Sequence, residues 1–176
     1  MLESKLNYLR LEFAASHHNH CSKRLWIEAD QSLMFEGTCL LAVSQRTVWD
    51  FIIDPARIGK CLPNVKSLEA ESESKSIAVI RVGVGPIRSD FKFRIDIVEK
   101  QPTSHVRLKA RGTGSGSSLD LDTVIDLREE PGGCALSYRS DVRVGGILAG
   151  LGQRLMKDTA DKTIAGIFEC IKNQVV

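Results

Sequence analysis

Apolar and polar side chains alternate strictly through the middle of the chain, and this alternation predicts a series of β-strands. Between residues 87 and 97 every second residue is apolar or small, and charged residues fill the positions between them. A period of two is typical of strands that bury one face. Turn sequences such as Pro131-Gly132-Gly133 separate the alternating runs. An antiparallel meander with one apolar and one charged face is therefore expected, with strands at 77–84, 87–99, 105–111, 119–128 and 134–144.

The flanking segments have different periodicities. Residues 33–43 read as one more strand, and Ser44 is a suitable N-cap for a helix that Asp54-Pro55 would end. A second short helix is expected at 56–61. From Ile147 to about Asn173 apolar residues recur at helical spacing, which predicts one long amphipathic helix. This helix is long enough to cover the apolar face of the meander, and a sheet curled around it encloses either a packed core or a pocket.

The lengths of the turns predict which residues lie opposite each other in neighbouring strands. On the charged face, oppositely charged side chains are expected to pair across the strands, which mainly fixes the register. On the apolar face, the same registers bring hydroxyl and apolar side chains together. The expected pairs are Arg111 with Asp120, Lys109 with Asp122, Asp96 with Arg107, Phe93 with Ala110, Leu108 with Thr123, Thr123 with Ser140, and Ile125 with Tyr138.

Composition narrows the class of protein. The chain has 176 residues and a formal charge of +2, so no nucleic-acid partner is expected. Hydrophobic residues make up 43%, which is typical of a soluble globular protein of one domain. We see neither an apolar run of about 20 residues nor a signal-peptide pattern. The five cysteines are scattered without a C-x-x-C pair, so we expect reduced thiols in a cytoplasmic protein rather than disulfides.

The predicted order of elements resembles the START-like helix-grip fold, an α+β fold with two short helices after the first strand. Within that fold, a series of short phrases is similar to the CoxG family of carbon monoxide dehydrogenase accessory proteins and occurs in the family's order. Asn64 stands where relatives usually have Gly. The resemblance covers about residues 33–174, so we assign 33–176 to a helix-grip domain and 1–32 to an N-terminal extension. The phrases are Val48-Trp49, Asp54-Pro55, Cys61-Leu62-Pro63, 82–87, Leu136-Ser137-Tyr138, 144–149, Leu151-Gly152 and Arg154-Leu155.

This resemblance implies a non-catalytic accessory protein with an internal apolar pocket for a lipid- or quinone-like molecule. The CoxG family is associated with bringing a molybdenum-containing dehydrogenase to the membrane. The expected partners are therefore an apolar or amphipathic small molecule and a dehydrogenase of that type. The expected location is cytoplasmic, with peripheral association at the inner face of the membrane; a homodimer is left open. The wider superfamily also contains polyketide cyclases, so the fold alone does not settle the function.

Candidate chemistry in the domain consists of hydroxyl groups without a base. His105 is predicted on the charged outer face. Hydroxyls without a neighbouring base orient a ligand better than they transform it, so no catalytic residue, metal or cofactor is predicted. The alternative is a polyketide cyclase- or hydrolase-like enzyme that uses Tyr138. The hydroxyls could also bond to each other, and the apolar residues could form a packed core. The expected lining residues are Ser89, Phe91, Phe93, Thr123, Tyr138, Ser140, Leu151, Leu155, Met156 and Thr159.

The N-terminal extension carries two further patterns. Its leucines and Phe13 recur at roughly helical spacing, which predicts a weak amphipathic helix that would dock on a membrane, a partner or the domain itself. His17, His18, His20 and Cys21 are residue types that bind transition metals, but their spacing matches no defined site. We therefore predict no metal site there.

Overall fold

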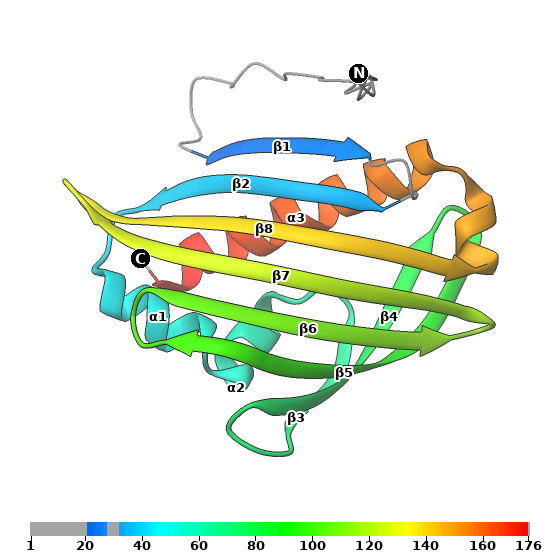
Figure 1. The fold of residues 1–176 in the computed structure, drawn as a ribbon, viewed down its shortest axis with the longest axis horizontal. Coiled ribbons are helices and arrows are strands. Elements are labelled where there is room, and N and C mark those ends of the chain that lie inside the picture. Colours follow the sequence, from blue (N-terminus) through cyan, green and yellow to red (C-terminus); the bar gives the residue numbers. More distant parts are fainter. Residues whose placement is uncertain (1–20, 28–31, 176) are drawn as a thin grey trace, which may run out of the picture.

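A single antiparallel sheet of eight strands forms the body of the protein in the computed structural model, which describes residues 21–27 and 32–175. The strand order is β1-β2-β8-β7-β6-β5-β4-β3. The sheet is curved, and the long helix α3 lies along one of its faces (Figure 1). The strands are β1 (Cys21–Ile27), β2 (Leu33–Leu41), β3 (Val65–Ala70), β4 (Lys75–Val84), β5 (Ile87–Gln101), β6 (His105–Gly114), β7 (Ser117–Glu130) and β8 (Gly133–Gly146).

The helices lie at the two ends of the sheet and across its inner face. Ser44 caps α1 as expected, and Asp54, which was expected only to end this helix, also caps α2; each accepts a hydrogen bond from a backbone N–H of the first turn. The predicted C-terminal helix is divided into a 3-10 segment and an α-helix, since Gly152 between them has a φ of 84°. The segments are α1 (Gln45–Ile52), α2 (Pro55–Ile58), η1 (Gly59–Cys61), η2 (Ile147–Leu151) and α3 (Gln153–Val175).

Among the described residues, no helix combines the length and the apolar character needed to cross a membrane.

Helix α3 crosses the concave side of the sheet. Its main backbone contacts with the sheet are with β2 and β4, and it also contacts η1 and α1. The strands between β2 and β4 in the sheet order therefore form the floor of a trough that α3 spans. The alternating pattern of the sequence is observed: the inner face is apolar and the outer face is charged. The predicted α+β helix-grip architecture is confirmed.

Buried side chains form two clusters at opposite ends of the trough. The first, which we call the closed-end cluster, lies among α1, η1, the end of α3 and the strands beside them, and includes Trp49, Phe51 and Leu136. The second, the tip-end cluster, includes Phe91 and Leu148 and lies near η2 and the start of α3. Half-buried residues of the inner face lie between them, and Tyr138 packs against both.

The cysteines contradict the expectation of reduced thiols. Cys61 of η1 and Cys170 of α3 form a disulfide although 109 residues separate them in the chain, and their Cα atoms lie 5.3 Å apart. Local sequence carries no signal of such a pairing, because the two residues meet only when α3 folds back onto η1. Cys134 is a free, fully buried thiol. The disulfide joins the two elements that close one end of the trough.

Most predicted registers are observed, but the pairing of β5 with β6 is shifted. Arg107 pairs with Glu99 instead of Asp96, and Ala110 lies beside Ile95 instead of Phe93. The cause is a register shift between Ile97 and Glu99, and such an irregularity is invisible to a pattern based on turn length alone. All five pairs expected between β6, β7 and β8 are correct: Arg111–Asp120, Lys109–Asp122, Leu108–Thr123, Thr123–Ser140 and Ile125–Tyr138.

Two strands were not predicted. β3 is a short edge strand whose pairing with β4 is interrupted by an irregularity near Val65, so its alternation is weak. β1 lies within the segment assigned to the N-terminal extension and adds an edge strand beside β2. The predicted helix around Phe13 and the cluster of His17, His18 and His20 lie outside the described residues.

Candidate ligand-binding site

The hydroxyl groups expected on the inner face do meet there. Thr123 of β7 and Ser140 of β8 lie directly opposite each other, and their side-chain oxygens are 2.8 Å apart in a hydrogen bond. Two residues along β8, the ring of Tyr138 packs against Phe168 of α3, with 4.7 Å between the ring centroids. These side chains place a polar band on a surface that is otherwise apolar. The sequence left open that these hydroxyls form hydrogen bonds with each other, and Thr123 and Ser140 do so.

Tyr138 keeps its proton at any physiological pH. Burial raises the pKa of its hydroxyl to about 12, and the negative charges of Asp161 and Glu36 act in the same direction. The hydroxyl forms no hydrogen bond with another described residue. Tyr138 is therefore a protonated donor at the edge of the inner face, with no hydrogen-bond partner in the part of the chain that the structure describes. This state suits holding an acceptor group of a ligand, and it does not suit a role as a base or nucleophile.

The middle of the inner face is not fully packed. Leu108 of β6 is half-buried although its strand neighbours on the same face, Val106 and Ala110, are buried. Ile125 of β7 and Ile164 of α3 are likewise half-buried although both face the interior. Apolar side chains that lie between the sheet and α3 and remain partly accessible indicate surface that an apolar molecule could cover.

The other predicted lining residues divide into three groups. Phe91, Phe93 and Met156 are buried within the tip-end cluster, so they pack as core. Ser89 forms a hydrogen bond with Ser115 across neighbouring hairpins. Leu151 and Leu155 are half-buried against the tip-end cluster, and the hydroxyl of Thr159 donates to the carbonyl of Leu155 within α3 at 2.9 Å. Thr123, Tyr138 and Ser140 thus form the coherent polar part of the predicted set.

Three residues of this region were missed by sequence reasoning. Phe168 lies on the apolar stripe of the predicted helix, so its periodicity could have placed it on the inner face, but not opposite Tyr138. Ile125 was expected beside Tyr138 and could have been included by parity. Asp161 gave no signal, because a charged residue within a mixed helix pattern is usually solvated.

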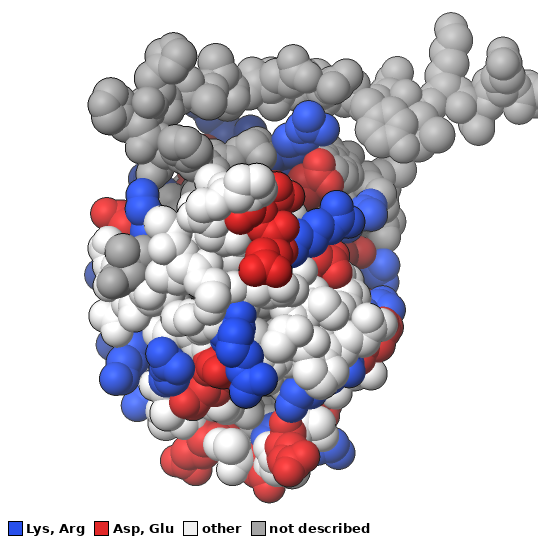
Figure 2. All heavy atoms as spheres, turned by 90° about the vertical axis from the view of Figure 1, so that its left-hand side faces the viewer, with Lys and Arg blue, Asp and Glu red and all other residues white. Residues whose placement is uncertain are grey.

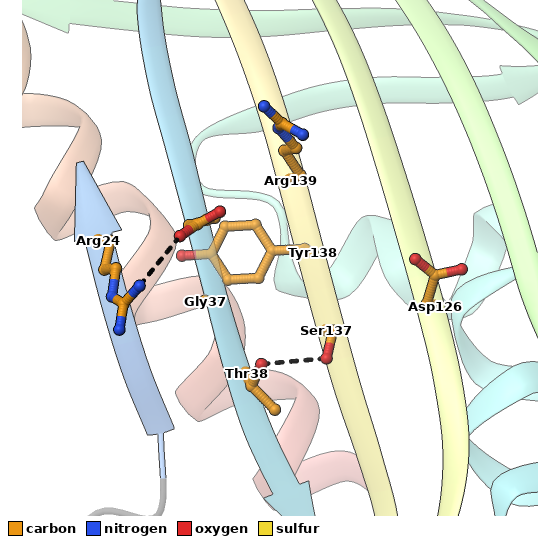
Figure 3. A pocket seen from close by; sticks show the side chains of 8 residues that line it. Arg24, Gly37, Thr38, Asp126, Ser137, Tyr138 and Arg139 are labelled. Atoms are coloured by element: carbon orange, nitrogen blue, oxygen red, sulfur yellow. Dashed lines mark hydrogen bonds and ion pairs between the residues drawn. The ribbon is translucent and has the colours of Figure 1, made fainter. Parts of the chain in front are cut away.

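Two hollows lie on the outer face of the sheet. One, of about 380 Å³, is lined by Tyr138 and by polar residues of β1, β2, β7 and β8. Figure 3 shows the ring of Tyr138 beside Gly37, with the hydroxyls of Thr38 and Ser137 bonded 3.0 Å apart. The other, of about 530 Å³, is lined largely by alternating acidic and basic side chains of β5 to β8. Because opposite charges are mixed in both hollows, neither favours an ion of one sign.

Charged residues of the outer face form a ladder of ion pairs away from the inner hydroxyls. Arg107 donates to both oxygens of Asp122, each at 2.8 Å, and to Glu99 at 2.9 Å. His105 contacts Asp126 at 2.7 Å, and this hydrogen bond raises the pKa of the imidazole. As predicted from parity, this histidine lies on the charged face and has no access to Tyr138. Within the described residues, no group of side chains is arranged to hold a metal ion.

Comparisons with known proteins agree with this architecture. The family model of CoxG, the G subunit of carbon monoxide dehydrogenase, matches residues 37–176. A conserved protein from Geobacillus kaustophilus superposes with a TM-score of 0.75 and 28% sequence identity, covering 81% of this chain and 94% of that one. No match was found among curated proteins.

More distant solved structures share the fold alone. A START superfamily protein from Mycobacterium smegmatis has a TM-score of 0.63 at 14% identity, covering 81% of this chain and 96% of that one. The Zhui aromatase/cyclase from a Streptomyces species has a TM-score of 0.62 at 11% identity, covering 82% and 93%. The family model spans every strand from β3 to β8 and all helices. The observed fold is also the predicted helix-grip fold. The chain therefore belongs to the CoxG family of carbon monoxide dehydrogenase.

Proposed function

We propose that the protein is a non-catalytic accessory protein that binds an apolar or amphipathic small molecule between the sheet and α3. The partly accessible apolar surface in the middle of the inner face, between two fully buried clusters, carries this proposal. Covering such a surface with a ligand is favourable because it removes apolar area from water, at about 25 cal/mol per Å² before the costs of binding.

The polar band suggests the chemistry of the ligand. The hydroxyl of Tyr138 is a donor without a partner among the described residues, and one hydroxyl of the Thr123–Ser140 pair keeps a proton to donate. A ligand with an acceptor at one end, such as the carbonyl of a quinone or the carboxylate or ester of a lipid, would satisfy these donors.

The family suggests where such a protein would act. Membership supports a role beside a carbon monoxide dehydrogenase-type molybdenum hydroxylase, which the accessory protein would bring to the membrane. Under this proposal the protein is located in the cytoplasm and associates peripherally with the inner face of the membrane.

Native mass spectrometry of the purified protein, followed by denaturing extraction, tests the binding proposal. We expect a co-purified quinone, fatty acid or lipid in stoichiometric amount, or stabilisation by ubiquinone-1 or oleate in thermal-shift titration. Ile125→Trp would fill the inner surface and should weaken binding by at least about tenfold. Val124→Trp adds the same side chain on the opposite face of β7 and should leave binding unchanged. An empty protein that binds neither probe would overturn the proposal, as would equal effects of the two variants.

Tyr138→Phe separates binding from the cyclase-like alternative. It removes one hydrogen bond and should weaken binding by about five- to tenfold, while the fold is retained because the ring still packs on Phe168. If the purified protein cyclises or hydrolyses a polyketide thioester, and Tyr138→Phe abolishes that turnover, the non-catalytic assignment is wrong.

A further inference from the structure

Three uncharged stretches of the sequence come together at one end of the molecule. The stretches are the β4–β5 turn with its flanks (82–87), the β6–β7 turn with its flanks (112–119) and the segment around η2 (144–153), and none contains Asp, Glu, Lys or Arg. The β4–β5 and β6–β7 turns and η2 all lie at the right-hand end of the molecule in Figure 1. We call this region the tip end. Three stretches that are far apart in the sequence and carry no charged residue thus lie at the same end of the described structure.

Contacts between the stretches hold the tip end together. The backbone N–H of Ile147 donates to the carbonyl of Gly116 at 3.3 Å, and that of Leu148 donates to the hydroxyl of Ser117 at 3.1 Å. The β4–β5 turn lies against the start of α3, since a Cβ added at Gly85 would come within 2.6 Å of the side chain of Leu155. The tip end is therefore one assembled surface at the start of α3.

The tip end exposes apolar side chains to solvent. Ile147 is 60% exposed, the largest exposure of a large hydrophobic side chain among the described residues. Pro86 at the β4–β5 turn is also exposed, and Ile87 and Leu151 are half-buried. Leu148, the residue after Ile147, is only 2% exposed and anchors η2 to the core. Ile147 is thus held at the surface on a fixed segment rather than left on a free chain end.

Arginines border the uncharged stretches. Of the six residues that immediately flank them, five are arginine and one is Asp120. All five arginines are exposed, and Arg88 and Arg154 form no ion pair with any residue that the structure describes. The ion pairs of Arg81 and Arg111 with aspartates are long, at 4.0 and 3.5 Å. The flanking arginines are Arg81, Arg88, Arg111, Arg143 and Arg154.

Two turns at the opposite end of the sheet carry acidic residues, whereas the β5–β6 turn (102–104) there contains no charged residue. The β7–β8 turn follows Glu129 and Glu130, and the β3–β4 turn contains Glu71 and Glu73. Figure 2 faces the left-hand end of the molecule as drawn in Figure 1 and shows acidic groups there, interspersed with basic ones. An apolar surface bordered by arginine is therefore a property of the tip end and not of the sheet turns in general.

We propose that the tip end docks on the surface of an anionic lipid bilayer. Ile147 would enter the boundary between head groups and acyl chains, and the flanking arginines would contact lipid phosphates. A bilayer fits this surface because Pro86 and Ile147 are exposed there and the three described stretches contain no acidic residue, and a fluid surface accommodates several separate turn tips. This proposal rests on the proposed function in one respect: the proposed function explains why the protein would bind a membrane at all.

Docking at this end would also give the inner face a short path to the membrane. η2 and the start of α3, which border the trough, are part of the tip end, whereas the far end of α3 is held to η1 by the Cys61–Cys170 disulfide. An apolar ligand could then pass between the bilayer and the inner face with little exposure to water.

Co-sedimentation of the full chain with lipid vesicles tests the proposal. We expect binding to vesicles of phosphatidylcholine with about one third phosphatidylglycerol, little binding to phosphatidylcholine alone, and weaker binding at high salt. Ile147→Glu should lower the partition coefficient at least about tenfold. The double variant Arg88→Gln/Arg154→Gln should lower it about 25-fold, at about fivefold for each arginine.

The opposite end supplies matched controls. Val98 is the other exposed large hydrophobic, at 47%, and Lys100 and Arg128 are exposed and form no ion pair with a described residue. Val98→Glu and Lys100→Gln/Arg128→Gln should therefore leave vesicle binding within about twofold of the parent. Thermal unfolding followed by circular dichroism checks that every variant is folded.

Two results would overturn the proposal: no binding to anionic vesicles, or an equal loss of binding in the tip-end and control variants. Ile147→Trp provides a gain-of-binding check, because indole rings favour the membrane interface. It should strengthen binding and shift its emission to shorter wavelength on vesicles, and an unchanged spectrum would contradict the insertion of this side chain. Ligand binding in solution, measured with ubiquinone-1 or oleate, is independent of these outcomes. Failure of the docking proposal is therefore distinguishable from failure of the binding proposal.

Discussion

The two ends of the trough differ in how they are held together. At the closed end, α1, η1 and the last turns of α3 bury Trp49 and Phe51, and the Cys61–Cys170 disulfide adds a covalent link between η1 and α3. At the tip end, glycine-containing turns and the short 3-10 segment η2 meet the start of α3, and Ile147 is exposed. Packing, covalent reinforcement and turn charge all change from one end to the other.

This difference suggests a division of labour along α3. The start of α3 packs on the tip-end cluster through Met156, whereas its other end packs on the closed-end cluster and is also joined covalently to η1. A shift of α3 is therefore expected to be easier at its start, where no covalent link opposes it. Access to the inner face is then expected at the tip end, beside the surface proposed to meet the membrane.

Removing the disulfide is expected to have the largest effect on stability. Cys61→Ser/Cys170→Ser releases a loop of 109 residues in the unfolded chain, which should lower the free energy of unfolding by about 4 to 5 kcal/mol in the chain-entropy model. Urea unfolding of the parent and the double variant, both without reductant, measures this loss. A change below about 1 kcal/mol would show that the closed end does not depend on its covalent link.

Truncation compares a core side chain of the closed end with a half-buried side chain at the surface of the tip end. Phe51 is 2% exposed in the closed-end cluster, and Phe51→Ala should cost about 3 to 5 kcal/mol. Leu151 at the tip end is half-buried, so Leu151→Ala should cost only about 1 kcal/mol, because part of its surface is already in water. Chemical unfolding gives both values. Equal losses would show that Leu151 is packed as tightly as the buried Phe51.

Replacing a glycine by alanine at each end compares how closely the backbone is surrounded by other atoms there. A Cβ at Gly133, the first residue of β8, would lie 1.9 Å from the carbonyl oxygen of Leu41, so Gly133→Ala should cost at least about 2 kcal/mol. A Cβ at Gly150 in η2 would meet no atom within 4 Å, so Gly150→Ala should change stability by less than about 0.5 kcal/mol. Thermal melts distinguish the two. A severe loss at Gly150 would mean that η2 is packed more tightly than its exposure indicates.

The smallest expected effect is the pH dependence that His105 contributes on the outer face. Its hydrogen bond to Asp126 raises the pKa of the imidazole above the ordinary 6.5, opposed by burial and supported by Glu99. The stabilisation is therefore complete below about pH 6.5 and is lost as the pH rises through the raised value. Because the pair is partly exposed, we expect less than about 1 kcal/mol. Stability curves of the parent and His105→Gln, measured between about pH 5.5 and 8.5, should converge at the alkaline limit.

Parity along the strands made the polar part of the candidate site predictable. Alternation placed Thr123, Ser140 and Tyr138 on the inner face, and the turn lengths placed Thr123 opposite Ser140. The same parity could not tell core from accessible surface, so Phe91, Phe93 and Met156 were assigned to the lining although they are buried. Burial depends on what packs against a strand from elsewhere in the chain, and a local pattern carries no such information.

Short-range patterns of the sequence determined the faces of the sheet, the registers of β6 to β8 and the family membership, because each depends on residues adjacent in the chain or on the neighbouring strand. Only the tertiary structure decided which distant segments meet. It paired Cys61 with Cys170, placed β1 beside β2, brought Phe168 onto Tyr138 and assembled three uncharged stretches into one end. Such contacts arise from closing long loops around the core, and their energy depends on the geometry of the whole chain rather than on any single stretch of it.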